Sequence, residues 1–207
     1  MIVVLDYGMG NVGSIVNMLK KVGEEPTVAT RGDQLGPAEK IVLPGVGLFD
    51  KAIENLTERN FIEPLNAAQA SGKWILGVCL GMQLMTRKSE EGKLPGLGWV
   101  DAEVVRFQFD KLEKHLKVPH MRWNLAEPAK ASPFFDFPRT REQRFYFIHS
   151  YYVRCGQQED ILTRTVHGHS FVSSFMRGNL IGVQFHPEKS HKFGIEFFKR
   201  FAELEPA

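Results

Sequence analysis

The stretch Trp74-Ile75-Leu76-Gly77-Val78-Cys79-Leu80-Gly81 joins a short apolar run to a helical pattern. Trp74–Val78 is predicted to form a buried strand, and Leu80–Arg87 is predicted to form a helix. A G-x-nucleophile-x-G sequence between a strand and a helix is typical of a tight, strained elbow that presents one side chain, here Cys79. Glycines flank the cysteine because a Cβ at either position would crowd the turn.

Cys79 has the expected surroundings of a nucleophile. The N-terminus of a helix favours the thiolate over the thiol, which raises the fraction that can attack. The next backbone N–H, that of Leu80, is expected to point at an oxyanion on the attacked carbonyl. The elbow alone leaves a second interpretation open, in which Cys79 is a small buried apolar side chain.

A base and an orienting group for Cys79 are offered by His186-Pro187-Glu188, which follows the apolar run Leu180–Phe185. In an extended chain residues i and i+2 point to the same side, so His186 and Glu188 are able to face one pocket. A carboxylate beside an imidazole fixes its tautomer and supports the imidazolium. Because catalytic groups of parallel sheets gather at the carboxyl ends of strands, the elbow and this motif support each other.

The first half of the chain alternates strand and helix patterns, which predicts a parallel sheet with helices on both faces. Asn11 is expected to cap the first helix, and Gly23 is expected to end it. Leu43-Pro44-Gly45-Val46-Gly47 follows a strand, and its glycines suit either a second oxyanion donor or an ordinary turn. The other predicted strands and helices of this half are Ile2–Asp6, Pro26–Thr30, Lys40–Leu43, Asp50–Glu58 and Ile62–Ala70.

The second half has strand patterns with few helices between them, which predicts a more antiparallel section. A closing helix is expected over His191–Leu204, and Lys111–Arg144 is expected to be rich in loops. The whole chain, residues 1–207, is predicted to be one α/β domain. The strand patterns lie at Trp99–Phe107, Phe145–Val153, Ile161–Val166, Phe171–Met176 and Leu180–Phe185.

The composition excludes several classes of protein. A net charge of +2 over 207 residues gives no reason to expect nucleic acid or an anionic membrane as a partner. Cys79 and Cys155 are the only cysteines, too few to staple a fold of this size, and they fit a reducing compartment. We find no apolar run of the roughly 20 residues that span a bilayer and no secretory signal after Met1. A cytoplasmic location is expected.

Dinucleotide binding and metal binding are the other functions to compare with cysteine catalysis. Gly8-Met9-Gly10-Asn11-Val12-Gly13 has the form of a dinucleotide-binding loop, and Asp33 lies about 20 residues further on, where an acid would bind ribose. That alternative, based on Gly8, Gly10 and Gly13, explains neither the cysteine elbow nor the His-Pro-Glu motif. No metal and no cofactor are expected, because His167-Gly168-His169 is the one close histidine pair and no cysteine has zinc-finger spacing.

The motifs together resemble the class I, triad-type glutamine amidotransferases. GVCLGMQ at 77–83, PGVG at 44–47 and VQFHPEKS at 183–190 carry this resemblance. DYGMGN at 6–11, VPHMRWN at 118–124 and FIHSYY at 147–152 narrow it to the glutaminase subunit of imidazole glycerol phosphate synthase. The resemblance implies a flavodoxin-like three-layer α/β sandwich, with a mostly parallel central sheet and an antiparallel extension.

The resemblance also implies a function and a partner. Glutamine would be hydrolysed to glutamate and ammonia through a γ-glutamyl thioester on Cys79, with His186 and Glu188 completing the triad. Ammonia would pass through a channel into a (β/α)8-barrel synthase, the other half of a heterodimer, which makes imidazole glycerol phosphate and AICAR in histidine biosynthesis. No metal takes part.

The remaining site residues are implied by position in the matching motifs. The oxyanion hole would be shaped by Val46, Gly47 and Leu80. The α-amino and α-carboxylate groups of L-glutamine would be held by Gln83, Glu91, Ser150 and Tyr151. The junction with the synthase and the ammonia channel would lie near Asn11, Met121, Trp123, Asn124 and Lys189.

One residue departs from the family pattern. The family usually reads H-M-G-W-N where this chain has His120-Met121-Arg122-Trp123-Asn124. Arginine in place of glycine adds a long cation and removes backbone freedom beside the expected oxyanion strand or interface. The alternative is therefore a paralogous subunit that delivers ammonia to a related synthase, for sugar amidation in surface-polysaccharide biosynthesis.

Overall fold

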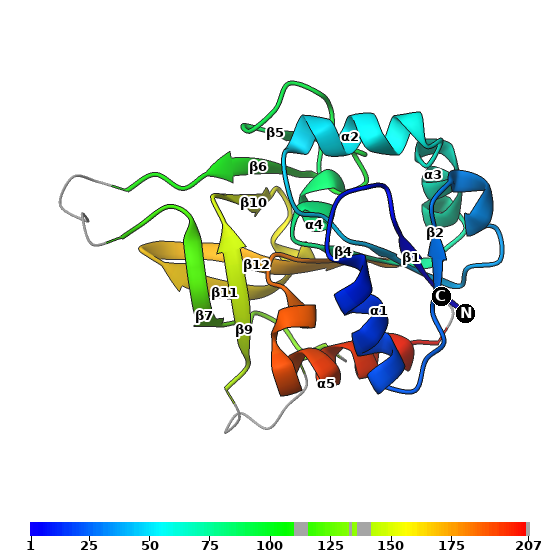
Figure 1. The fold of residues 1–207 in the computed structure, drawn as a ribbon. Coiled ribbons are helices and arrows are strands. Elements are labelled where there is room, and N and C mark those ends of the chain that lie inside the picture. The colour runs from blue at the N-terminus through cyan, green and yellow to red at the C-terminus, as the bar shows by residue number, and fades with distance from the viewer. Residues whose placement is uncertain (110–115, 133, 136–141, 206–207) are drawn as a thin grey trace.

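Parallel strands form the part of the sheet that carries the predicted site (Figure 1). The computed structural model describes residues 1–109, 116–132, 134–135 and 142–205. Neighbouring strands of this part are parallel and in matched register. In sheet order they are β2 (Thr27–Ala29), β1 (Ile2–Leu5), β3 (Lys40–Leu43), β4 (Trp74–Val78) and β13 (Leu180–Val183).

The alternation of side chains along these strands divides the core into two layers. In β1, Val3 and Leu5 pack in the layer that contains α2 (Phe49–Glu58) and α3 (Ile62–Ala70). Ile2 and Val4 pack in the opposite layer, with α1 (Val12–Lys21) and α5 (His191–Ala202). Figure 1 shows these helix pairs on the two faces of the sheet. Each fully buried aliphatic side chain contributes roughly 1.5–3 kcal/mol.

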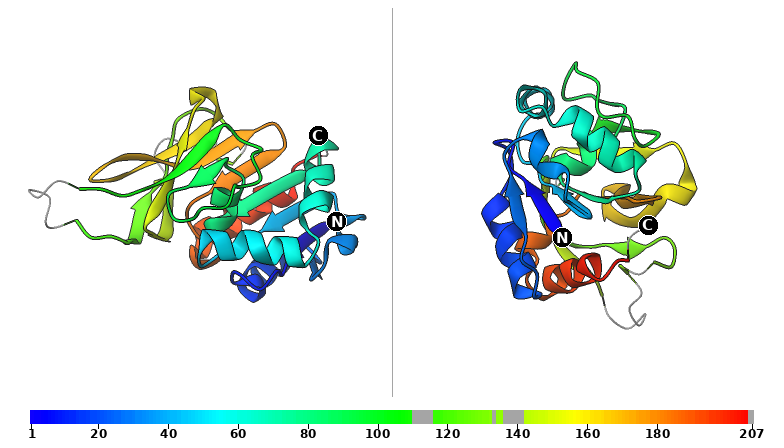
Figure 2. Two further views of the ribbon diagram at one scale, coloured as in Figure 1. Left: turned by 90° about the horizontal axis from the view of Figure 1, so that it is seen from above. Right: turned by 90° about the vertical axis from the view of Figure 1, so that its right-hand side faces the viewer.

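The antiparallel strands continue the same sheet beyond β13. They are β12 (His169–Arg177), β10 (Tyr151–Cys155) and β6 (Ala102–Arg106), with β5 (Lys88–Ser89) parallel at the edge. Seen from above, this section extends away from the helical layers (Figure 2). β11 (Ile161–His167) pairs with β12 and with β8 (Glu127–Pro128). The 3-10 turns are Gly32–Leu35, Gln158–Asp160 and Pro187–Lys189.

The first-half prediction is confirmed at its boundaries. The side chain of Asn11 caps α1 by accepting a hydrogen bond from the Ser14 N–H at 3.3 Å. Gly23 follows the helix with φ of 95°, a conformation that glycine adopts without a Cβ penalty. The predicted α/β class with an antiparallel portion is also confirmed.

The prediction of one strand over Phe145–Val153 is wrong. The chain forms β9 (Arg144–His149), breaks at Ser150, and resumes as β10 in the main sheet. β9 pairs instead with β7 (His120–Leu125) in a separate antiparallel ribbon. β7 falls inside the stretch Lys111–Arg144, for which loops are expected. Of that stretch, residues 111–115, 133 and 136–141 lie outside the described residues.

The helix predicted over Leu80–Arg87 is shorter than expected, because α4 spans only Leu80–Leu84. The carbonyls that would continue it accept hydrogen bonds from a returning segment. Leu97 donates to Leu84 O at 2.8 Å, and Trp99 donates to Met85 O at 3.0 Å. Tertiary hydrogen bonds therefore replace the next helical turn.

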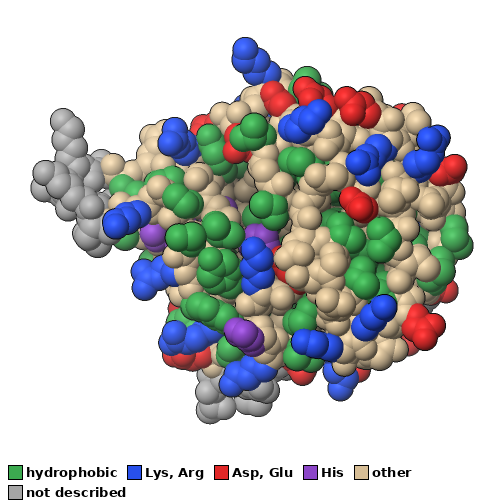
Figure 3. Space-filling model, in the orientation of Figure 1, with side chains coloured by type: hydrophobic (Ala, Val, Ile, Leu, Met, Phe, Trp, Pro, Cys, Tyr) green, Lys and Arg blue, Asp and Glu red, His purple; other side chains and the backbone are tan. Residues whose placement is uncertain are grey.

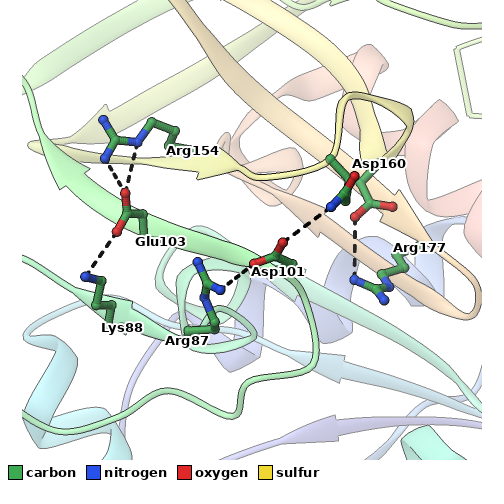
Figure 4. A network of polar contacts seen from close by, with 8 residues as sticks. Arg87, Lys88, Asp101, Glu103, Arg154, Asp160 and Arg177 are labelled. Atoms are coloured by element: carbon green, nitrogen blue, oxygen red, sulfur yellow. Dashed lines mark hydrogen bonds and ion pairs between the residues drawn. The ribbon is translucent and has the colours of Figure 1, made fainter.

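A charged network lies on the antiparallel section of the sheet (Figure 4). Glu103 forms ion pairs with Lys88 and Arg154, and Asp101 forms an ion pair with Arg87 at 2.6 Å. Arg177 lies 3.9 Å from Asp160. Most of these side chains are solvent-exposed, and exposed pairs contribute little each. The ion pairs connect neighbouring strands, and these side chains are not arranged as a catalytic site.

The elbow glycines are required by close packing of the backbone. A Cβ on Gly77 would lie 2.6 Å from the Gly81 carbonyl oxygen, and a Cβ on Gly81 would lie 1.9 Å from the Leu43 carbonyl oxygen of β3. Both distances are far below van der Waals contact. The absence of two side chains lets α4 approach β3 and β4.

We expect Gly81→Ala to lower the free energy of unfolding by about 2–3 kcal/mol, because β3 and α4 must separate to admit the methyl group. Gly13 in α1 is the matched control, since a Cβ there would have no atom within 4 Å. Gly13→Ala should be stabilising by about 0.5 kcal/mol. Urea unfolding of both variants checks this, and equal stabilities would contradict the packing argument.

Candidate active site

A cavity of about 250 Å³ lies where β3 and β4 end, beside the junction of β9 and β10. The elbow, the loop after β3 and the Ser150 break all contribute to it. It contains each residue expected in the oxyanion hole and each residue expected to hold L-glutamine. Its lining consists of Val46, Gly47, Cys79, Leu80, Gln83, Glu91, Pro119, Ile148, His149, Ser150 and Tyr151.

Cys79 occupies a strained backbone conformation between β4 and α4. Its φ is 55° and its ψ is −109°, outside the regions that L-residues favour. The strain is held by hydrogen bonds on both sides of the residue: Cys79 N–H donates to Val183 O at 2.7 Å, and Gln83 N–H donates to Cys79 O at 3.3 Å. The thiol is 7% exposed and lines the cavity.

His186 and Glu188 form a buried pair next to the elbow. The Nδ1–H of His186 donates to Glu188 Oε1 at 2.7 Å, and the two side chains are 1% and 2% exposed. This bond fixes the tautomer with the free position at Nε2. Nε2 is buried and makes no well-formed hydrogen bond to any residue that the structure describes. The imidazole is thus oriented by Glu188 and has an open nitrogen for chemistry.

The backbone of His186 is braced by the ribbon strand β9. His186 N–H donates to Tyr146 O at 2.9 Å. Ser190 Oγ accepts from Tyr146 N–H at 3.0 Å and donates to His186 O at 2.6 Å. A single hydroxyl therefore completes a bridge between β9 and the histidine.

Cys79 and His186 interact electrostatically across the elbow. Burial lowers the pKa of His186, but the electrostatic interaction with Cys79, together with the hydrogen bond and charge of Glu188, outweighs burial and raises the net pKa above its usual range. The surroundings therefore favour the imidazolium form of His186. An imidazolium next to the elbow is a proton donor for a leaving group.

The expected oxyanion donor is engaged within the chain. Leu80 N–H donates to Gly45 O at 3.3 Å. The loop is held there because the buried Tyr7 hydroxyl donates to Pro44 O at 2.7 Å. A Cβ on Gly45 would lie 2.7 Å from Gly81 N, so the loop and the elbow pack directly against each other. The Leu80 N–H must leave Gly45 O before it can stabilise an oxyanion.

The residues expected to hold L-glutamine surround the far end of the cavity. Glu91 accepts from Phe49 N–H at the start of α2 at 3.0 Å, and its pKa is raised mainly by burial. The Gln83 amide donates to Tyr151 O at 3.2 Å. Ser150 lies at the break between β9 and β10, so the strand interruption places it at the cavity.

A pair of buried histidines lies behind the Ser150 break. His149 donates from Nδ1 to Tyr151 O at 2.7 Å, because a carbonyl can only accept. Its Nε2 then accepts from His120 Nδ1–H at 3.0 Å. Burial, and then the neighbouring ring of His149, lower the pKa of His120 to about 2, and burial lowers the pKa of His149 to about 3. Both rings are neutral in the folded chain.

The residues expected at the synthase junction lie on an exposed face outside the cavity. Met121 and Trp123 are 58% and 37% exposed on β7, and the Trp123 ring stacks on His191 at 5.6 Å. In Figure 3 apolar side chains gather on the side of the molecule that carries β7 and β9, with Lys and Arg around them. Asn11 and Lys189 are exposed, and Asn124 is half-buried.

The dinucleotide-binding alternative does not fit the structure. The space above Gly10 is taken by the chain itself, since a Cβ there would lie 3.0 Å from Pro44 and 3.1 Å from Gly45 N. A Cβ on Gly13 would have no close neighbour, and Asp33 lies in a 3-10 turn. Gly10 instead lets the chain pack against the oxyanion loop, and Gly8 faces the side chains of Asn55 and Arg59.

Sequence reasoning missed several residues of the site. Gln184 donates to Cys79 Sγ at 3.6 Å, and Tyr7 and Ser190 hold the oxyanion loop and His186. All three lie inside the motifs that carry the family resemblance, and Gln184 and Ser190 are polar residues that flank the His-Pro-Glu motif. His149 lies in the FIHSYY motif, which by itself assigns it no role.

Comparison with protein families gives a match over nearly the whole chain. The family described as glutamine amidotransferase class-I matches residues 3–203. The chain is 43% identical over 205 residues to imidazole glycerol phosphate synthase subunit HisH 2 of Pseudomonas aeruginosa, covering 99% of this chain and 100% of that protein. It is 45% identical over 202 residues to the protein of the same name from Methanococcus maripaludis, covering 97% and 98%.

Solved structures share the fold at low sequence identity. A glutamine amidotransferase crystal structure superposes with a TM-score of 0.75 at 17% identity, covering 98% of this chain and 99% of that chain. The structure of PurLQS from Thermotoga maritima gives 0.71 at 19% identity, covering 97% and 95%. These likenesses support the architecture described above.

From the buried pair His120 and His149 we expect the protein to lose stability in acid. Both folded pKa values lie below the unfolded value of about 6.5, so the stabilisation is present above that pH and is lost as the pH falls toward the folded values. We expect the free energy of unfolding to fall by about 4 kcal/mol between pH 7.5 and 5.0, about 2 kcal/mol for each ring. Urea unfolding at both pH values measures this.

The control for this effect is an exposed histidine. His120→Phe should reduce the pH-dependent loss, while His191→Gln should leave it as in the parent. An equal loss in the parent and in His120→Phe would show that the pair does not carry the acid sensitivity.

Proposed function

Because the chain belongs to the class I glutamine amidotransferases, we propose that Cys79, His186 and Glu188 are its catalytic triad. The enzyme is a glutaminase subunit of the imidazole glycerol phosphate synthase type, which serves histidine biosynthesis. The observation that supports the triad most directly is the strained elbow that presents Cys79 beside the oriented His186–Glu188 pair.

The first half-reaction forms a thioester and releases ammonia. The Cys79 thiolate attacks the side-chain carbonyl carbon of L-glutamine, and the carbonyl oxygen becomes an oxyanion. The imidazolium of His186 gives its Nε2 proton to the departing amine, the C–N bond breaks, and neutral ammonia leaves. Glu188 keeps Nδ1 protonated throughout and stabilises the positive ring.

The second half-reaction regenerates the enzyme. The neutral His186 takes a proton from water through Nε2, and the hydroxide attacks the thioester carbon. The C–S bond breaks, L-glutamate leaves, and the thiolate returns. Each step uses the same nitrogen, which is the atom that the structure leaves without a described partner.

The ends of the substrate fit the chemistry of the cavity. The carboxylate of Glu91 suits the α-ammonium of L-glutamine. The hydroxyl of Ser150 and backbone donors near Tyr151 suit its α-carboxylate. Gln83 lies between these groups and the elbow. The amide end of the substrate then reaches Cys79 and the backbone of Val46, Gly47 and Leu80.

The second product, ammonia, is proposed to pass to a (β/α)8-barrel synthase in a heterodimer. The exposed face with Met121 and Trp123 is the proposed docking surface, with Asn11, Asn124 and Lys189 around it. An apolar mouth suits the passage of a neutral molecule. Docking is also proposed to release the Leu80 N–H from Gly45 O and so complete the oxyanion hole.

A second candidate concerns only the partner. Arg122 is exposed on β7, in the middle of the proposed docking face. A cation there favours a synthase with a matching acidic group. This observation supports the alternative of a related synthase used for sugar amidation, with the glutaminase chemistry unchanged.

Among the residues that the structure describes, no helix has the length and apolarity to cross a membrane.

We expect Cys79→Ala to abolish glutamate release, because no other nucleophile lies at the elbow. In the complex with the synthase, product formation from added ammonium salts should persist. The matched control is Cys155→Ala: Cys155 is also buried, and its pKa is raised to about 12, mainly by burial. This control should keep the parent rate. Glutamate release by Cys79→Ala at the parent rate would exclude the proposed triad.

The isolated chain is expected to be a poor glutaminase, because the Leu80 N–H is bonded to Gly45 O. Adding the synthase with its ligand should raise the rate about 100-fold or more, the usual worth of an oxyanion donor. Glutamate production by the purified chain, with and without the co-purified synthase, tests this. An isolated chain that is already at full rate would contradict the activation proposal.

A further inference from the structure

Gln184 contacts the sulfur of Cys79 from a fully buried position. It directly follows β13, and its backbone N–H donates to Ser173 O at 2.9 Å, so the residue is anchored in the sheet. Its side-chain Nε2 lies 3.6 Å from Cys79 Sγ, within hydrogen-bond range for sulfur. Nothing in the triad chemistry above uses this contact.

The orientation of the Gln184 amide is fixed by its neighbours. The Tyr151 carbonyl can only accept, so the Gln83 atom that lies 3.2 Å from it is the amide nitrogen. That same nitrogen lies 3.0 Å from the Gln184 side chain, whose facing atom must therefore be Oε1. The remaining amide group of Gln184 is the N–H2, and it points at the sulfur.

The chain of hydrogen bonds continues from Tyr151 to the ribbon. Tyr151 O also accepts from His149 Nδ1 at 2.7 Å, and His149 Nε2 accepts from His120 Nδ1 at 3.0 Å. His120 Nε2 in turn lies 3.2 Å from the Asn124 side-chain amide on β7. The buried hydrogen-bonded chain (Asn124, His120, His149, Tyr151 O, Gln83, Gln184) thus ends at the cysteine sulfur.

We propose that Gln184 is a further catalytic residue, which donates a hydrogen bond to the Cys79 thiolate, and that the buried hydrogen-bonded chain from Asn124 holds it in position. The proposal rests on the proposed triad. The thiolate is the attacking group in the first half-reaction and the leaving group in the second, so one donor serves both steps. Gln83 and His149 are positioning residues, since they act through Gln184.

The charge of the sulfur explains why a donor is needed in addition to His186. The Nε2 proton of His186 goes to ammonia in the first half-reaction and is taken from water in the second, so it serves the departing and attacking groups. Gln184 donates to the sulfur without giving up a proton, so its hydrogen bond to the thiolate is available both at the attack and at the leaving step. An amide suits this task because it donates at every working pH and, unlike lysine, adds no charge that would compete with His186.

The test is the pH dependence of Cys79 alkylation by iodoacetamide in the full purified chain, followed by intact mass. Gln184→Leu and Gln184→Glu both lose the donor, and Gln184→Glu keeps an acceptor for Gln83. We expect each to slow alkylation at neutral pH about tenfold and to move its midpoint to higher pH by about one unit. If Gln184→Leu does not fold, Gln184→Met, which also lacks the donor and adds no charge, takes its place.

Gln143→Leu is the matched control. Gln143 is also a buried glutamine, its Nε2 has no partner among the described residues, and it does not line the cavity. It should keep the parent profile. Parent profiles in both Gln184 variants would overturn the proposal. That result differs from failure of the triad itself, in which Cys79 of the parent would react no faster than Cys155 and Cys79→Ala would remain active.

The positioning part of the proposal is tested by a double variant. His120→Phe removes one ring of the chain at a site remote from the sulfur and should shift the alkylation midpoint in the same direction as Gln184→Leu, by a smaller amount. Combined with Gln184→Leu it should add no further shift. Full additivity of the two shifts would overturn the role of the chain.

Discussion

The close approach of the loop after β3 to the cysteine elbow is the constraint on which the site depends. It requires bare backbone at Gly45, Gly77 and Gly81, where any Cβ would overlap a neighbouring main-chain atom. It also holds Cys79 at positive φ, which costs of order 1–3 kcal/mol. The bond from Cys79 N–H to Val183 O, between β4 and β13, offsets part of that cost and brings the strand that precedes His186 beside the elbow.

The same packing explains why the site is assembled but incomplete. The hydrogen bond from Leu80 N–H to Gly45 O stabilises the loop, and the Tyr7 hydroxyl reinforces it through Pro44 O. A donor that stabilises the resting loop is not available to an oxyanion. The Leu80 N–H can bond either to Gly45 O, which stabilises the free chain, or to an oxyanion, which raises the glutaminase rate. A contact from outside on this loop is a direct way to shift the N–H from one acceptor to the other.

The sequence predicted the parallel half well, because short apolar runs such as Lys40–Leu43 and Trp74–Val78 are bounded by glycine and proline. The elbow and the His-Pro-Glu motif followed from local spacing alone. The errors arose where long-range hydrogen bonds decide the structure. Leu84 and Met85 accept from residues near 97–99, which ends α4 early. The break at Ser150 follows from pairing with two different sheets, which no local pattern records.

That break has a chemical consequence. At Ser150 the chain leaves the β7–β9 ribbon and joins the main sheet as β10. This turns His149 inward and places the Tyr151 carbonyl between His149 and Gln83. Two donors on one carbonyl connect β7, on the exposed face, with the amide beside the sulfur. Since both histidine rings are neutral and each nitrogen has a partner, the links have one consistent set of donors and acceptors. A polar core of this kind tolerates few rearrangements, so a shift of β7 must either be transmitted along it or break one of its bonds.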